Sequence, residues 1–156
     1  MYWALVLTVG SLCWVVAVLG APVALERGGA LSTMAALLYE GAGRICHQRP
    51  ERSFHLAGVP LPVCARCSGL YVAGAAGALL AWTGRRLAPT PRSTRLIVLL
   101  AALPTALGVT AEIAGLLHTS NSFRMLSALP LGAAAGWIFV RSLRAESEEP
   151  APANAL

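Results

Sequence analysis

The residues best able to do chemistry in this chain are cysteines and histidines gathered in one short stretch. Cys46 and His47 are adjacent, Cys64 and Cys67 form a CxxC pair, and His55 lies between the two groups. A CxxC turn lets two thiolates reach one ion at about 2.3 Å from each sulfur, and a second pair can complete a tetrahedron. The stretch therefore predicts a zinc site. Its ligands would be Cys46, Cys64, Cys67 and His47, with His55 as the alternate fourth ligand.

Thiol redox chemistry is an alternative for the same cysteines. Cys67 opens a predicted helix, and the positive end of a helix dipole lowers the pKa of a thiol. Arg66 adds positive charge between Cys64 and Cys67, so this pair could alternate between dithiol and disulfide with Cys46 as an exchange partner. A structural disulfide or buried thiols without turnover is the third interpretation. Whether the chain is an enzyme stays open, and a thiol–disulfide oxidoreductase is the enzyme class to consider.

A single acidic residue, Glu112, interrupts a predicted membrane helix. A carboxylate at membrane depth is costly, so it should face the interior of the bundle or water and find a partner. Arg124, across a short turn, is the expected ion partner. Two roles are open for Glu112. It could belong to a proton or cation relay in a small transporter, or it could pair with Arg124 and hold the helices together.

The composition indicates an integral membrane protein. Of the 156 residues, 56% are hydrophobic and 12% are charged, whereas soluble domains carry roughly 25% charged residues. Disordered chains need low hydrophobicity and high charge, so that class is excluded. The net charge of +5 comes from arginines at the ends of apolar runs, where they anchor helices to headgroups. We therefore predict the lipid bilayer as a partner and no nucleic acid.

The uncharged runs predict an all-α polytopic protein of the cell membrane: a four-helix transmembrane bundle with a Cys/His-rich loop and a short interfacial helix. The second run is rich in glycine, which lets a membrane helix pack closely against a neighbour. A membrane protein partner or a second copy of the chain remains open. The expected spans are about 2–25, 67–84, 96–117 and 124–141, with the interfacial helix at about 31–45, the loop at 46–66, one membrane domain over 1–144 and a disordered tail over 145–156.

Two motifs resemble a known family. Cys46-His47-Gln48-Arg49 and the run from Pro62 to Tyr71, which contains Cys64-Ala65-Arg66-Cys67, are similar to the CHQ…CARC signature of domain-of-unknown-function family 2085, a group of small prokaryotic predicted membrane proteins. The resemblance extends weakly to Ser120-Asn121 and Arg124. It implies an integral membrane protein and brings no activity with it. The family pattern has an acidic residue soon after the proline of the third span; here Pro104 is followed by none until Glu112.

Overall fold

The computed structural model describes residues 1–83 and 90–147, and this part of the chain is almost entirely helical. The expected all-α class is therefore confirmed. The one departure is a short hairpin in the loop between α2 and α3, whose strands have two residues each. The helices are α1 (Tyr2–Arg27), α2 (Gly29–Gly43), the 3-10 turn η1 (Pro50–Arg52), α3 (Ala65–Leu80), α4 (Pro91–Ile113) and α5 (Asn121–Glu146), and the strands are β1 (His55–Leu56) and β2 (Val59–Pro60).

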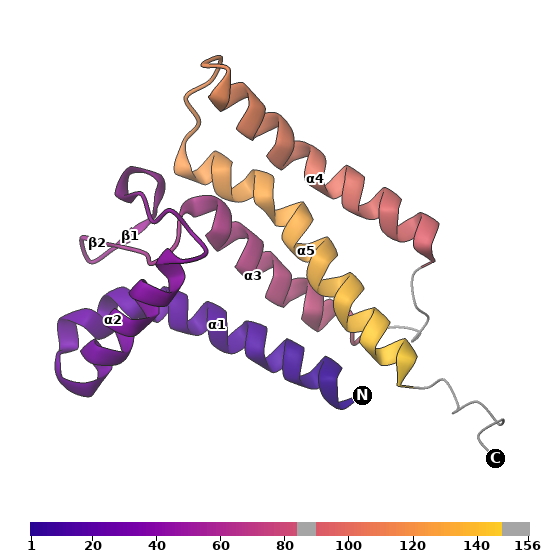
Figure 1. Cartoon of the computed structure of the whole chain (residues 1–156), viewed down its shortest axis with the longest axis horizontal. Helices are drawn as coiled ribbons and strands as arrows, with labels where there is room; N and C mark the ends of the chain where they lie inside the picture. Colours follow the sequence, from indigo (N-terminus) through magenta and orange to yellow (C-terminus); the bar gives the residue numbers. More distant parts are fainter. Residues whose placement is uncertain (84–89, 148–156) are drawn as a thin grey trace.

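Four helices lie side by side in the spatial order α1, α3, α5, α4, and α2 packs against α1 (Figure 1). In chain order, α1, α3, α4 and α5 alternate in direction, so α3 and α5 run parallel to each other and both described ends of the chain lie at one end of the bundle (Figure 1). The loop between α2 and α3 and the turn between α4 and α5 lie at the other end (Figure 1). This second end holds three of the four cysteines: Cys46, Cys64 and Cys67.

Three helices are long and apolar enough to cross a membrane: α1 with 26 residues, α4 with 23 and α5 with 26. At 1.5 Å per residue each exceeds the roughly 30 Å of a hydrocarbon core. They correspond to the expected spans over 2–25, 96–117 and 124–141. The helix α4 begins five residues earlier than expected because Pro91 suits a first helical position and the Thr90 side chain accepts a hydrogen bond from the Ser93 amide at 3.3 Å.

The remaining expected span, over 67–84, differs from the structure. The helix α3 has 16 residues, or about 24 Å, which is less than an apolar core requires. It starts before Cys67 because Cys64 is its N-cap residue, and it ends at Leu80. The described part of the chain thus has five α-helices, three of spanning length, and a count of four spanning helices does not follow from it.

The helix α5 extends into the segment 145–156 that was expected to be a disordered tail. The helix α5 continues to Glu146, so the first two residues of the predicted disordered segment 145–156 are helical. Its last turn is held by packing, because Arg144 is buried, donates to the Ala81 carbonyl and lies over the Trp82 ring. The rest of that segment, 148–156, lies outside the described residues.

The helices α3 and α5 touch through glycines. A Cβ atom added at Gly77 would overlap the Ala133 carbonyl oxygen, and one added at Gly136 would overlap the Gly74 carbonyl oxygen. No side chain fits at either position, so the two backbones are in direct contact, as the glycine content of α3 predicts. This contact positions the start of α3, where the CxxC pair lies, against the start of α5.

We predict that Gly136→Ala destabilises the protein, whereas Gly10→Ala does not. The added methyl group at position 136 must push α3 and α5 apart, which costs about 1–3 kcal/mol. A Cβ atom added at Gly10 would have no neighbour within 4 Å, so alanine there is neutral or slightly favourable for the helix. Thermal unfolding of both purified variants in one detergent measures the difference. Equal melting temperatures would contradict a close α3–α5 contact.

Candidate metal centre

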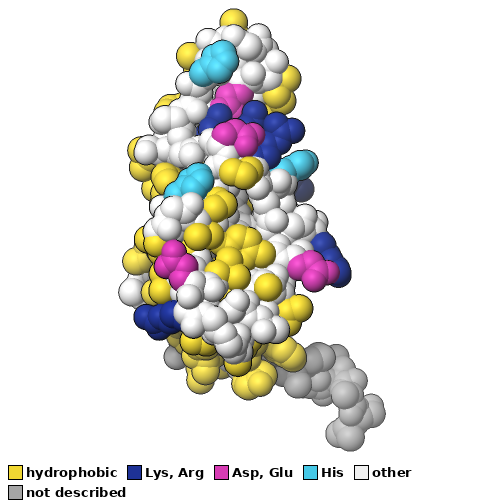
Figure 2. Space-filling view, turned by 90° about the vertical axis from the view of Figure 1, so that its left-hand side faces the viewer, with side chains coloured by type: hydrophobic (Ala, Val, Ile, Leu, Met, Phe, Trp, Pro, Cys, Tyr) yellow, Lys and Arg dark blue, Asp and Glu magenta, His cyan; other side chains and the backbone are white. Residues whose placement is uncertain are grey.

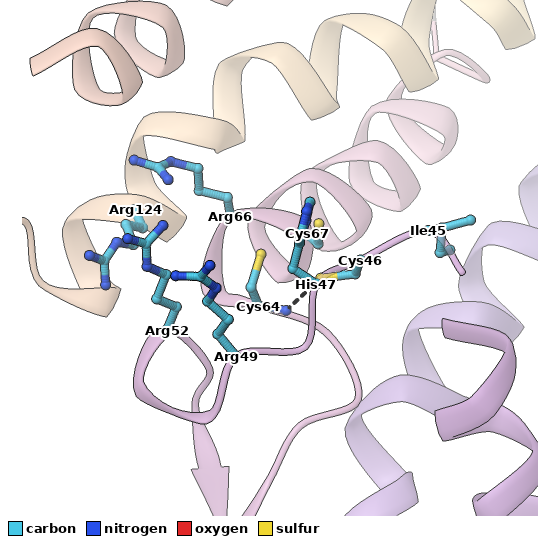
Figure 3. Close-up of a pocket in the computed structure, with 9 residues that line it drawn as sticks. All are labelled: Ile45, Cys46, His47, Arg49, Arg52, Cys64, Arg66, Cys67 and Arg124. Carbon is cyan, nitrogen blue, oxygen red and sulfur yellow. Dashed lines mark hydrogen bonds between the residues drawn. The ribbon is translucent and has the colours of Figure 1, made fainter. Parts of the chain in front are cut away.

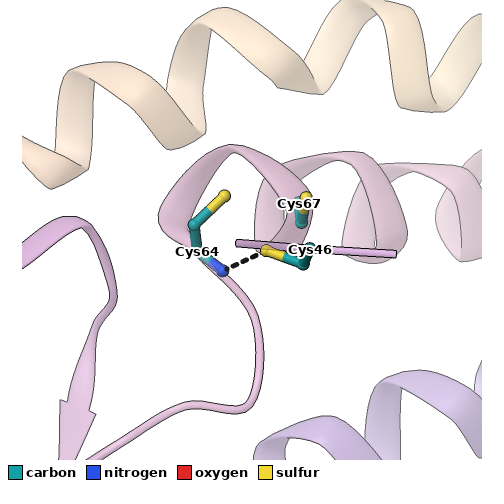
Figure 4. Close-up of side chains that lie close together, drawn as sticks. All are labelled: Cys46, Cys64 and Cys67. Atoms are coloured by element: carbon teal, nitrogen blue, oxygen red, sulfur yellow. Dashed lines mark hydrogen bonds between the residues drawn. The ribbon is translucent and has the colours of Figure 1, made fainter. Parts of the chain in front are cut away.

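Three cysteine thiols converge at the end of the bundle opposite the described ends of the chain. Cys46 follows α2, Cys64 is the N-cap of α3, and Cys67 lies in the first turn of α3. Their sulfur atoms all lie within 4.8 Å of one another (Figure 4). Tetrahedral zinc with bonds of about 2.3 Å places sulfurs about 3.8 Å apart. Small side-chain rotations would therefore bring all three thiols to one ion.

Local backbone structure holds Cys46 beside the CxxC pair. The Cys46 amide continues the hydrogen bonding of α2, with a 2.9 Å bond to the Ala42 carbonyl. The Cys64 amide donates to the Cys46 sulfur at 3.2 Å (Figure 4). Cys46 is also buried, and it packs with Val18 and Val63. These contacts fix the position of the Cys46 sulfur beside the CxxC pair.

The thiols also influence one another. A hydrogen bond with the Cys67 thiol lowers the pKa of the Cys64 thiol to about 5, although partial burial opposes this effect. The same interaction raises the pKa of the Cys67 thiol, so the contact favours a single thiolate in the Cys64–Cys67 pair. Thiolates are both the metal-binding and the nucleophilic form of cysteine, so this property is common to the metal and redox interpretations.

The structure separates the two histidines. His47 lines the same cavity of about 450 Å³ as the three cysteines (Figure 3). His55 lies exposed in β1 and lines a different, largely apolar cavity together with Phe54 and Leu61. Sequence spacing alone left both residues open as the fourth ligand. His47 is exposed as well, and the ligand atoms that lie within 4.8 Å of one another are those of the three cysteines; the shared cavity is what favours His47 over His55.

A glutamine that sequence reasoning did not single out ties the loop together. The Gln48 side-chain amide donates to the Tyr39 carbonyl at 2.6 Å and to the Pro62 carbonyl at 2.8 Å, and the Tyr39 hydroxyl donates to the Pro60 carbonyl at 2.6 Å. Gln48 has a φ of 45°, a conformation that costs a side-chain-bearing residue about 1 kcal/mol. These bonds offset that cost. In the sequence, the one feature that could have indicated this role was the place of Gln48 in the CHQ motif.

A second set of bonds joins the loop to α5. The Asn121 side-chain amide donates to the Ser53 carbonyl at 3.0 Å, and its oxygen accepts from Arg124 at 2.9 Å. Ser53 is buried, and its hydroxyl donates to the Arg49 carbonyl at 2.9 Å. The loop is therefore fastened to both α2 and α5 by the protein's own polar groups.

Glu112 has two arginine partners, one expected and one not. Arg124 lies 2.8 Å from one carboxylate oxygen, and Arg66 lies 2.5 Å from the other. The Thr119 hydroxyl donates to the same carboxylate. The side chain of Glu112 is 10% exposed, and those of Arg66 and Arg124 are 17% and 13% exposed. The arrangement joins the first turn of α3 to α4 and α5, which is what a helix-packing role for Glu112 requires.

The face of the molecule that carries the loop concentrates charge. Figure 2 shows arginine and acidic side chains gathered in one patch in the upper part of this face, with histidines on either side of it and apolar side chains below. Such a patch suits the boundary of a membrane, because arginines are stable at headgroup depth and not in the hydrocarbon core.

We predict that Glu112→Ala lowers stability far more than Glu40→Ala. Removing the buried carboxylate leaves Arg66 and Arg124 without a counter-charge, which costs about 3 kcal/mol or more. Glu40 pairs with Arg44 on the surface of α2, with side chains 69% and 78% exposed, and such pairs contribute about 0–1 kcal/mol. Thermal unfolding of the two variants makes the comparison. Similar losses in both would show that the buried pairs do not hold α3 to α4 and α5.

The comparisons with known proteins agree with the composition and the motifs. The family model DUF2085, described as a predicted membrane protein, matches residues 46–138. The chain belongs to this family. The matched range contains the three clustered cysteines, His47, Glu112 and its two arginine partners, whereas α1 and α2 lie outside it.

Two archaeal proteins are similar to this chain, and both are called uncharacterised. One, from Methanothermobacter thermautotrophicus, is 34% identical over 90 residues, which are 56% of this chain and 78% of that protein. The other, MJ1492 of Methanocaldococcus jannaschii, is 30% identical over 95 residues, which are 61% of each chain. No solved structure matches. Membership of the family therefore supports a membrane protein and leaves its activity to be argued from the site.

Proposed function

We propose that Cys46, Cys64, Cys67 and His47 bind one zinc ion at the end of the helix bundle. The observation that carries this proposal is the approach of three sulfurs, from two separate segments, to within 4.8 Å of one another. The amide directed at the Cys46 sulfur and the place of His47 in the same cavity add to it. Thiolate and imidazole donors in this number suit zinc.

The proposed role of the ion is structural. Four protein ligands leave no open position, which is typical of zinc sites that hold a fold together. The ion would link the segment after α2 to the first turn of α3 and so order the 46–66 loop. That loop would then present a fixed surface to a membrane protein partner or to lipid.

We further propose that the protein crosses the cell membrane several times, with α3 as a short fourth crossing beside α1, α4 and α5. Two features support this topology: α3 lies between α1 and α5, and both described ends of the chain lie at the same end of the bundle (Figure 1). In this arrangement the cysteine cluster lies at one surface of the bilayer.

Metal analysis of the purified full chain tests the proposed site. We expect about one zinc per chain, and a loss of most of it in Cys46→Ser, Cys64→Ser and Cys67→Ser, because each change removes a ligand. Cys13→Ser is the matched control: Cys13 is an exposed residue of α1, so its variant should retain the ion. Inductively coupled plasma mass spectrometry together with thiol titration measures both quantities.

The fourth ligand is tested in the same way. His47→Ala should weaken zinc binding by more than about tenfold, since even residues that only support a ligand typically cost that much, and His55→Ala should not. Metal-free protein with a Cys64–Cys67 disulfide that reduces reversibly at a physiological potential would overturn the zinc proposal. That result would instead identify a membrane thiol–disulfide oxidoreductase.

We also expect zinc removal to make the loop sensitive to protease, because ion binding and loop order are coupled. Trypsin should cleave after Arg52 much faster in Cys64→Ser, or in chelator-treated wild type, than in untreated protein. Readdition of zinc should restore protection in the wild type and fail to do so in Cys64→Ser. Mass spectrometry of the fragments locates the cut. Equal cleavage with and without chelator would show that the loop's own hydrogen bonds are sufficient.

A further inference from the structure

The cavity beside the thiols is also lined by four arginines. Arg49 and Arg52 come from the loop, Arg66 from the first turn of α3, and Arg124 from the first turns of α5. Figure 3 shows their side chains grouped on one side of the cavity, away from Ile45. The fold therefore brings together arginines that are up to 75 residues apart in sequence.

These arginines are only partly neutralised. Within residues 1–83 and 90–147, the carboxylate that forms salt bridges with members of this group is Glu112, and it pairs with Arg66 and Arg124. In the same described residues, Arg49 and Arg52 have no salt bridge. The Nε atom of Arg66 is buried and has no hydrogen-bond partner. The cavity thus has excess positive charge.

The proposed zinc site does not remove this excess. One zinc ion with three thiolates and a neutral imidazole has a net charge of −1, and Glu112 contributes another −1. Four arginines still leave a net charge of about +2 around the cavity. The first turn of α3, whose N-cap has no side-chain hydrogen bond, adds the positive end of a helix dipole at the same place.

We propose that this cavity binds a phosphate group. Guanidinium groups form charge-assisted, often bidentate hydrogen bonds with oxyanions, and four of them offer more donors than the two oxygens of a carboxylate accept. The volume of about 450 Å³ falls within the range of small-molecule sites and holds more than a phosphate ion. The phosphate would therefore belong either to a lipid headgroup or to a soluble molecule. Because the cavity lies at the end of apolar helices, both kinds of molecule can reach it.

This inference goes beyond the zinc proposal and does not require it. Glu112 positions Arg66 and Arg124, and the bonds from Ser53 and Asn121 position the loop. An ion in the thiol cluster would only order the loop further. Zinc content measured on the same samples keeps the two proposals distinguishable.

The test uses the full chain with Arg49→Gln, Arg52→Gln and the double variant. Isothermal titration with inorganic phosphate in a neutral detergent probes the soluble source. Thermal stability in nanodiscs of phosphatidylcholine, with and without phosphatidic acid, probes the lipid source. Arg44→Gln is the matched control, because Arg44 lies near the same end of the molecule and outside the cavity. Melting temperatures without either probe verify that each variant is folded.

We expect wild type and Arg44→Gln to respond equally to at least one probe, and the double variant to bind at least about tenfold more weakly, since each change removes a charge-assisted hydrogen bond. A response to inorganic phosphate identifies a soluble ligand, and a response confined to phosphatidic acid identifies a lipid; both support the proposal. It is overturned if wild type responds to neither probe. It is equally overturned if the folded double variant responds like the wild type.

Discussion

The buried carboxylate of Glu112 is the constraint on which the site end of the molecule depends. An ionised group at the end of an apolar helix is tolerated only with counter-charges in contact, and its two partners come from different helices, α3 and α5. The pairing therefore fixes where the first turn of α3 lies relative to α4 and α5. Because Arg66 stands between the two cysteines of the CxxC pair, the same pairing also orients the thiols.

Packing between helices also fixes the position of α3 relative to α5. Glycines let the backbones of α3 and α5 touch, and this contact leaves α3 little freedom to slide or rotate. The loop is held between α2 and α5 by Gln48 and Asn121. These contacts position parts of the loop, and the ion proposed for the thiol cluster would complete its order by linking the segment after α2 to the first turn of α3.

Sequence patterns predicted the broad fold well and the element boundaries less well. Long apolar runs indicate α1, α4 and α5 because a helix satisfies its own backbone hydrogen bonds in lipid. The bounds of α3 were wrong at both ends because an uncharged run does not show where a helix begins or ends: Cys64 caps the helix inside what was expected to be loop, and the helix ends at Leu80. The start of α4 at Pro91 was missed for a related reason, since helix capping by Thr90 lies in a charged segment outside the apolar pattern.

The sequence by itself identified the thiol-rich segment of the site and the membrane class of the protein. Residue types and short spacings such as CxxC describe neighbouring residues, and composition describes the whole chain. Neither kind of information depends on how the helices pack. Only the tertiary structure decided that His47 and not His55 shares the cavity, that Arg66 pairs with Glu112, and that four distant arginines meet. Those contacts join segments far apart in sequence, and their geometry follows from the rotation and offset of packed helices, which no local pattern encodes.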